Sequence, residues 1–124
     1  MTETVEQEIQ RKGLTAPRVT PADIDAAILE MHFVNAASAA MYAADHPVTV
    51  ASVHGSLGLL TLCLLVTKNG FTVVGKSACA SPENYDQAVG ERVALEDAKR
   101  QLWPLLGYAL RDAIALGKGN KAES

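Results

Sequence analysis

Two groups of side chains in this sequence have the chemistry to bind an anion. The first is a row on a predicted helix: Arg92, Glu96 and Arg100 recur every four residues and so share one helical face, with Trp103 next along it. Arginine pairs bidentately with phosphate. The row is consistent either with a phosphate site beside a stacking ring or with an ordinary solvent-exposed face of salt bridges.

The second group is the segment that begins at Ser81. Ser81 is a good N-cap and Pro82 suits the first position of a helix, so the free amides that follow would favour an anion. Asn84 can hydrogen-bond a base or a ribose, and Tyr85 or Phe71 can stack on a ring. Ordinary helix capping, with the aromatic residues in the core, is the alternative interpretation.

The motifs of catalysis and metal binding are missing from the sequence. It contains no nucleophile elbow, Walker loop or dinucleotide fingerprint. Its histidines lack the spacing of a zinc site and are interpreted as loop or surface residues: His32, His46 and His54. A thiol at Cys79, activated near Lys76, would need a base partner, and none is identifiable. We therefore expect a protein that is not an enzyme and that uses no metal and no cofactor.

A β-hairpin must position several of these residues. Asn69-Gly70 between two β-prone runs predicts a two-residue type I′ turn, with strands at roughly 59–68 and 71–79 that pair Lys68 with Phe71. Since side chains alternate along a strand, this register gives one apolar face and one mixed face. The apolar core face is expected to hold Leu60, Leu62, Leu64, Val66, Phe71, Val73 and Cys79. The mixed face, expected to be half-exposed or covered by another subunit, holds Thr61, Cys63, Leu65, Thr67, Thr72, Val74, Lys76 and Ala78.

Helices are predicted on both sides of the hairpin. Thr20-Pro21 begins an amphipathic helix over about 21–32. The C-terminal segment is helical up to Gly117, and Pro104 either kinks it or divides it in two. The segment 33–56 is left uncertain, with a possible helix from Ala36 to Ala44 and a possible strand from Pro47 to Val53.

Length and composition limit the class of protein. With 124 residues, 48% of them hydrophobic, the chain has enough apolar material for one domain. We expect a flexible segment at 1–19, a single α+β domain at 20–116 and a disordered tail at 117–124. A net charge of -3 argues against nonspecific nucleic-acid binding. The cysteines, Cys63 and Cys79, lie on opposite faces of the predicted hairpin, so free thiols in a reducing compartment are expected.

Targeting and membrane segments are also not expected. The first twelve residues are polar, and the longest apolar run, Leu57 to Val66, is too short to cross a bilayer. We expect a soluble protein in a reducing cytosol. Two strands alone are marginally stable, so we expect the hairpins to join across a homo-oligomer.

Several stretches together resemble one protein family. The stretches are Thr20–Ile28 (TPADIDAAI), Ser56–Cys63 (SLGLLTLC), Lys68–Asp86 (KNGFTVVGKSACASPENYD) and Leu102–Leu110 (LWPLLGYAL). In this order they are similar to the small phage and prophage proteins of the gene product forty-nine / gene sixty-six family. The family usually has acidic residues where Lys76 and Leu106 stand, so a contact made by those acids would be absent or altered here. Lys76 would also make its surroundings more favourable to anions.

The size and the layout of hairpin and long helix are similar to those of the phage proteins called Thoeris anti-defence one. Those proteins resemble signal sponges, which are oligomers that bind cyclic nucleotide-like immune messengers without degrading them. The resemblance implies a non-enzymatic anti-defence protein in the host bacterial cytoplasm, where it sequesters a cyclic nucleotide or an ADP-ribose-derived ligand. None of the sponge's binding residues is carried over. The ligand-binding candidates come from this sequence: Phe71, Lys76, Ser81, Asn84, Tyr85, Arg92, Arg100 and Trp103.

A module that binds and modulates a host protein is the alternative function. The exposed strand edge and the mixed face of the hairpin would serve it by strand addition. The sequence specifies neither the ligand or host partner nor the number of subunits.

Overall fold

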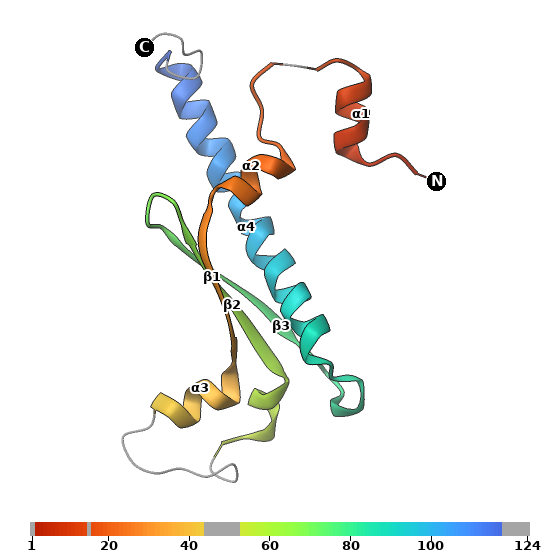
Figure 1. The fold of residues 1–124 in the computed structure, drawn as a ribbon, viewed down its shortest axis with the longest axis vertical. Helices are drawn as coiled ribbons and strands as arrows, with labels where there is room; N and C mark the ends of the chain where they lie inside the picture. Colours follow the sequence, from red (N-terminus) through yellow and green to blue (C-terminus); the bar gives the residue numbers. More distant parts are fainter. Residues whose placement is uncertain (1, 15, 44–52, 118–124) are drawn as a thin grey trace. The chain divides into compact units, whose positions relative to one another are not determined.

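The fold is α+β, with a three-stranded antiparallel sheet in the order β1-β2-β3 and one long C-terminal helix (Figure 1). The computed structural model describes residues 2–14, 16–43 and 53–117. In chain order the elements are α1 (Val5–Arg11), α2 (Pro21–Ala26), β1 (Ile28–Asn35), α3 (Ala36–Ala43), the 3-10 turn η2 (Gly55–Leu59), β2 (Leu60–Thr67), β3 (Thr72–Ala78), the 3-10 turn η3 (Pro82–Asn84) and α4 (Gln87–Ala115).

The chain divides into two units. One combines the N-terminal chain up to Ala27 with the chain from Leu102 onward, and the other spans Ile28–Gln101. The sheet lies wholly in the second unit, and α4 contributes residues to both. The sequence-based division at residues 19 and 116 stays a prediction.

The predicted helix over 21–32 is correct only in its first half. Helix α2 begins at Pro21, where Thr20 and Asp23 form a capping box, but it ends at Ala26. The residues from Ile28 onward form β1, which pairs with β2 along its length. The apolar spacing that predicted a helix coexists here with a strict alternation of apolar and polar residues from Leu29 to Phe33, and pairing with β2 selects the strand.

The hairpin forms as predicted, but its register is shifted by one residue. Leu60 lies opposite Ala78 and Val66 opposite Thr72, because the loop has three residues instead of two. Gly70 has a φ of 88° and its amide donates to the carbonyl of Thr67 at 2.8 Å, which is a tight turn followed by a glycine bulge. The Thr67 hydroxyl favours this loop by accepting from the amide of Phe71 at 3.0 Å.

The predicted faces of β2 are reversed, because α4 covers the face that was expected to be half-exposed or covered by another subunit. Thr61, Cys63, Leu65 and Thr67 are buried, whereas the leucines between them remain partly exposed. Val73 is buried as predicted, but Phe71 is 55% exposed. A one-residue change of register exchanges cross-strand partners, and the helix that covers the sheet packs on the mixed face.

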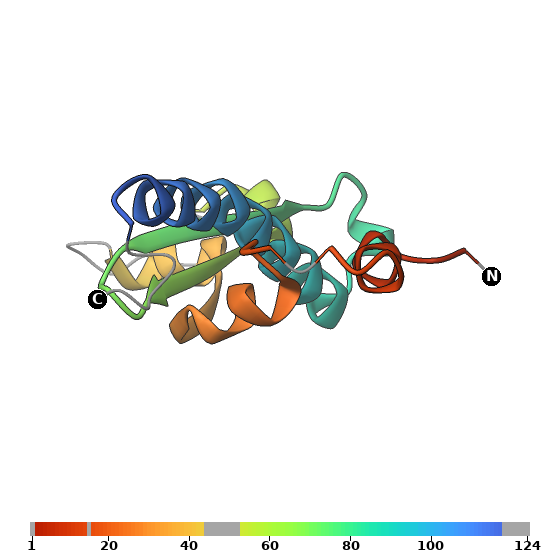
Figure 2. The ribbon, with the colours of Figure 1, turned by 90° about the horizontal axis from the view of Figure 1, so that it is seen from above.

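Glycine and alanine let α4 approach that mixed face closely. A Cβ atom at Gly75 of β3 would overlap the backbone of Ala94 and Ala98, and both alanines are fully buried. A Cβ atom at Gly90 of α4 would come within 3.0 Å of the Thr61 hydroxyl on β2. Figures 1 and 2 show this part of α4 running alongside β3.

Helix α4 is continuous through Pro104, which resolves the question that the sequence left open. Its N-cap is Asp86, whose carboxylate accepts from the amide of Val89 at 3.0 Å. Ser81 precedes only the short turn η3 and makes no side-chain cap. The long helix thus begins later than Ser81-Pro82 predicted.

The described part of the segment 33–56 contains the end of β1, helix α3 and the start of η2. Asn35 ends β1 and caps α3, because its side-chain oxygen accepts from the amide of Ala37 at 3.0 Å. Its side-chain nitrogen donates to the carbonyl of Gly58 at 3.0 Å, which ties α3 to η2. The possible helix at 36–44 is found as α3, and most of the possible strand at 47–53 lies outside the described residues. Both cysteines are free, as expected.

Candidate functional site

The residues predicted to bind a ligand do not form a single cluster. Phe71 lies beside the hairpin turn, whereas Tyr85 follows the far end of β3. The seven residues of β3 separate them, which is roughly 20 Å of extended chain. The two rings therefore cannot stack on the same base. Trp103 is 40% exposed and belongs to the other unit.

The segment from Ser81 to Tyr85 satisfies its own polar groups. The Ser81 hydroxyl donates to the Glu83 carboxylate at 2.7 Å, and this hydrogen bond lowers the pKa of Glu83. The amides of Asn84 and Tyr85 donate to the carbonyls of Ser81 and Pro82 at 3.0 and 3.2 Å. The Tyr85 hydroxyl contacts Gln87. Two of the amides expected to hold a phosphate, those of Asn84 and Tyr85, are thus engaged within the turn.

Asp97 brings together two of the predicted residues, Lys76 and Arg100. Its carboxylate accepts from the amide of Lys76 at 2.9 Å and from the Arg100 guanidinium at 2.9 Å. Arg100 therefore pairs with Asp97 and not with Glu96. Arg92 is exposed on α4, and it makes no ion pair within the described part of the chain.

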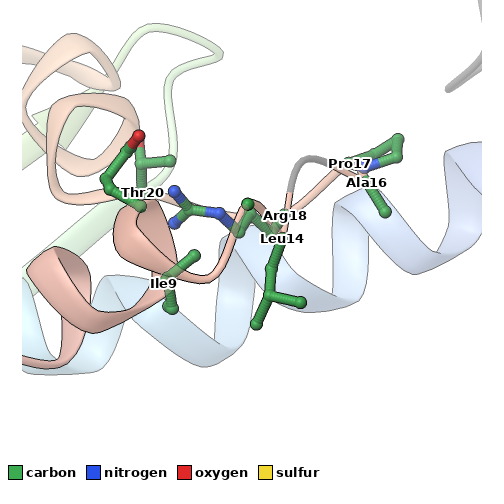
Figure 3. A pocket seen from close by; sticks show the side chains of 8 residues that line it. Ile9, Leu14, Ala16, Pro17, Arg18 and Thr20 are labelled. Carbon is green, nitrogen blue, oxygen red and sulfur yellow. The ribbon is translucent and has the colours of Figure 1, made fainter.

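A pocket of about 350 Å³ lies in the first unit, and none of the predicted ligand-binding residues lines it. Figure 3 shows its lining side chains, which include Ile9, Leu14, Arg18 and Thr20. The Arg18 guanidinium forms two hydrogen bonds with the Glu6 carboxylate, at 2.8 and 2.9 Å. Because its one cation is already neutralised, this pocket offers no anion site.

One face of the sheet in the second unit is apolar and partly exposed. We call it the leucine face, and its members are Val34, Leu62, Leu64, Val66 and Val74. Val74 is 51% exposed. Glu30, His32, Thr72 and Lys76 lie on the same side of the sheet in the same register. An apolar centre with a polar rim is the usual composition of a protein-binding surface.

The two edges of the sheet differ. At the β3 edge, Gln101 donates to the carbonyl of Val74 at 2.7 Å and Asp97 accepts from the amide of Lys76 at 2.9 Å. Side chains of α4 thus occupy the backbone groups to which another strand would bind. At the β1 edge, no described strand lies alongside.

Sequence reasoning missed β1 and the two residues of α4 that protect β3. The alternation from Leu29 to Phe33 was the signal for β1. Nothing in the sequence indicated Asp97 and Gln101, because their role depends on the angle at which α4 crosses the sheet.

The part of the chain that the structure describes contains neither a metal-binding cluster nor a membrane-spanning helix. No group of three or more His, Cys, Asp or Glu side chains is arranged to hold a metal ion in residues 2–14, 16–43 and 53–117. Within the same ranges, no helix combines the length and the hydrophobicity needed to span a membrane.

The fold and this surface define a small α+β protein with a partly exposed apolar sheet face. The chain belongs to the phage protein (N4 Gp49/phage Sf6 gene 66) family, whose model matches residues 19–114. This confirms the family inferred from the sequence motifs. No curated protein and no solved structure matches the chain. The similarity to the signal sponges stays a prediction.

Proposed function

We propose that this phage protein acts without catalysis, as an accessory protein that binds and modulates a host protein through the leucine face. The observation that carries the proposal is the reversal of the hairpin faces. Helix α4 covers the mixed face, and the leucines of β2 are left partly exposed. A contiguous apolar patch on a small protein commonly marks a binding surface.

The mixed composition around the patch supports a protein as the target. Lys76 and Thr72 lie at the β3 side, and Glu30 and His32 at the β1 side. Hydrogen-bonding groups around an apolar centre give orientation as well as affinity. A membrane surface would instead favour a cluster of cations.

Site-specific photo-crosslinking in host cells tests this proposal. A benzoylphenylalanine at Val74 is expected to crosslink to one host protein, because this side chain is half-exposed at the margin of the leucine face. The matched control carries the same group at Glu96, an exposed residue of α4 in the same unit. Leu64→Lys in the Val74 variant is expected to abolish the crosslink. Equal crosslinking from Val74 and Glu96, or no effect of Leu64→Lys, would contradict the proposal.

Sequestration of a nucleotide messenger is the second candidate function. The feature that supports it is Arg92, an exposed cation on α4 with no ion pair among the described residues. The test is native mass spectrometry with cyclic and ADP-ribose-derived nucleotides. A discrete mass gain that Arg92→Ala with Arg100→Ala removes would support this function. A mass gain unaffected by the double substitution would show that these arginines are not the site.

A further inference from the structure

The free edge of β1 has backbone groups arranged to accept another strand. In the hairpin, the amide of Thr67 donates to the carbonyl of Phe71 at 2.8 Å, so the odd-numbered residues of β2 face β3. The even-numbered residues of β2 then face β1, where they pair with Glu30, His32 and Val34. The amides and carbonyls of Met31 and Phe33 consequently point outward.

These outward groups have no hydrogen-bond partner among the described residues, whereas the corresponding groups at the β3 edge are bonded by Asp97 and Gln101. The residues from Glu30 to Asn35 also lack the lysine or proline that commonly blocks an edge strand. The register irregularity between Ile28 and Glu30 is confined to the start of the strand. One edge of the sheet is thus protected and the other is available.

We propose that a second copy of this chain pairs with β1 in antiparallel orientation, with Met31 opposite the partner's Met31. The two sheets would then form one six-stranded sheet about a two-fold axis. This self-pairing uses the edge of the sheet and leaves the leucine face available, so it does not depend on the proposed host partner.

The side chains of β1 favour a second copy of this chain as the strand that pairs with the free edge. They also favour the register centred on Met31. Centring the pair on Met31 places Glu30 opposite the partner's His32, so that carboxylate meets imidazole twice. Glu30 and His32 already lie 3.6 Å apart within one strand, and the four side chains would form one polar group. Centring the pair on His32 instead would place two imidazoles opposite each other and leave both carboxylates without partners.

The opposite side of the strand supplies the apolar contact. Met31 is 43% exposed. In the proposed register Met31 contacts the partner's Met31. Pairing therefore buries an apolar side chain that β1 leaves partly in solvent.

Analytical ultracentrifugation of the full chain and of a proline variant tests the pairing. Met31→Pro removes an amide that points outward, so the monomer keeps its β1–β2 hydrogen bonds while the second strand loses one. The wild type is expected to sediment as a dimer, and Met31→Pro as a monomer with unchanged circular dichroism. Leu64→Lys is the control, because it alters the leucine face and is expected to leave the dimer intact. A dimer that survives Met31→Pro but is lost in Leu64→Lys would overturn the proposal.

Single cysteines test the register without relying on the proline variant. In a Cys79→Ser background, Met31→Cys is expected to form an intermolecular disulfide under mild oxidation, since directly opposed residues in a hydrogen-bonded pair lie about 5.5 Å apart at Cα. Phe33→Cys is the matched control, and its two copies would be too far apart to join. Crosslinking through position 33 but not 31, or through neither, would overturn the proposal.

Discussion

Thr61 and Thr67 occupy the same buried face of β2, but their hydroxyl groups have different surroundings. The Thr67 hydroxyl donates to the side-chain oxygen of Asn69 at 2.6 Å and accepts from the amide of Phe71. The Thr61 hydroxyl is fully buried and has no hydrogen-bond partner in the described structure. It lies beside Gly90 of α4, where an added Cβ atom would be 3.0 Å from it. A buried hydroxyl without a partner is destabilising.

Replacing the two threonines should therefore have opposite effects. Thr61→Val keeps the shape of the side chain and removes the unsatisfied hydroxyl, so we expect the free energy of unfolding to rise by about 1 kcal/mol. For a chain of this size that corresponds to an increase in Tm of about 4 °C. Thr67→Val is the matched control and should destabilise by about 1 kcal/mol, because it removes hydrogen bonds from the hairpin loop. Thermal unfolding followed by circular dichroism measures both. A lower Tm for Thr61→Val would mean that its hydroxyl has a partner.

Local residue chemistry predicted some features of single positions correctly. Thr20-Pro21 began a helix, Asn69-Gly70 formed a turn, and the cysteines remained free. The prediction for Ser81 was wrong because Asp86 is an equally good cap and lies directly before the long helix. Two competing caps within six residues cannot be ranked from the sequence alone.

At the scale of elements, local sequence patterns did not predict which segments contact one another. The alternation in β1 and a helical spacing coexist in the same residues, and only the presence of β2 as a neighbour favours the strand. The reversed faces of β2 have the same origin. Four alternating aliphatic residues indicated a core, but the small residues Gly75, Ala94 and Ala98 allow α4 to pack closely on the opposite face.

Helix α1 is connected to the chain before α2 by the pair of Glu6 with Arg18. Their two hydrogen bonds, together with one from Gln10, lower the pKa of the Glu6 carboxyl from 4.5 to about 2. A carboxyl whose pKa is lower in the folded state than in the unfolded state stabilises the fold while it is ionised. This stabilisation is present above pH 4.5 and is lost as the pH falls from 4.5 towards 2.

Arg18→Gln should therefore raise the pKa of Glu6 towards 4.5 and remove the pH dependence of folding stability that this carboxyl contributes. The measurement is a titration of the Glu6 side-chain carbon resonance by NMR. Arg11→Gln is the matched control, because it breaks the pair of Arg11 with Glu3 and should leave Glu6 titrating near 2. If Glu6 titrates near 4.5 in the unmodified protein, the pair with Arg18 does not form in solution.

At the scale of the whole molecule, the sequence predicted the family and the α+β class but not the candidate surface. The family was indicated by motifs in the correct order, and the family model confirms it over residues 19–114. The predicted nucleotide site combined residues from the hairpin turn, the end of β3 and both units of the chain. The residue types suggested which side chains could bind a nucleotide. The distances between those side chains depend on the length of β3 and on the division of the chain into two units.

The single tryptophan makes it possible to ask whether the two units unfold together. Trp103 lies in the unit that includes the N-terminal chain, so its fluorescence provides a probe within that unit. Helix α4 runs from Gln87 to Ala115 without interruption across the boundary between the units. Dividing it there would create two new ends with unsatisfied backbone groups, and helices lose their order cooperatively.

We therefore expect a substitution in one unit to be detected in the other. Gly75→Ala introduces an overlap with the backbone of Ala94 and Ala98, which should destabilise the sheet unit by about 1–3 kcal/mol. Denaturant unfolding followed by Trp103 fluorescence and by circular dichroism should give coincident transitions, and both should shift to lower denaturant in Gly75→Ala. Gly107→Ala is the control on the same helix, because a Cβ atom at Gly107 meets no neighbour within 4 Å. If the Trp103 transition stays in place while the circular dichroism transition moves, the units unfold independently despite sharing a helix.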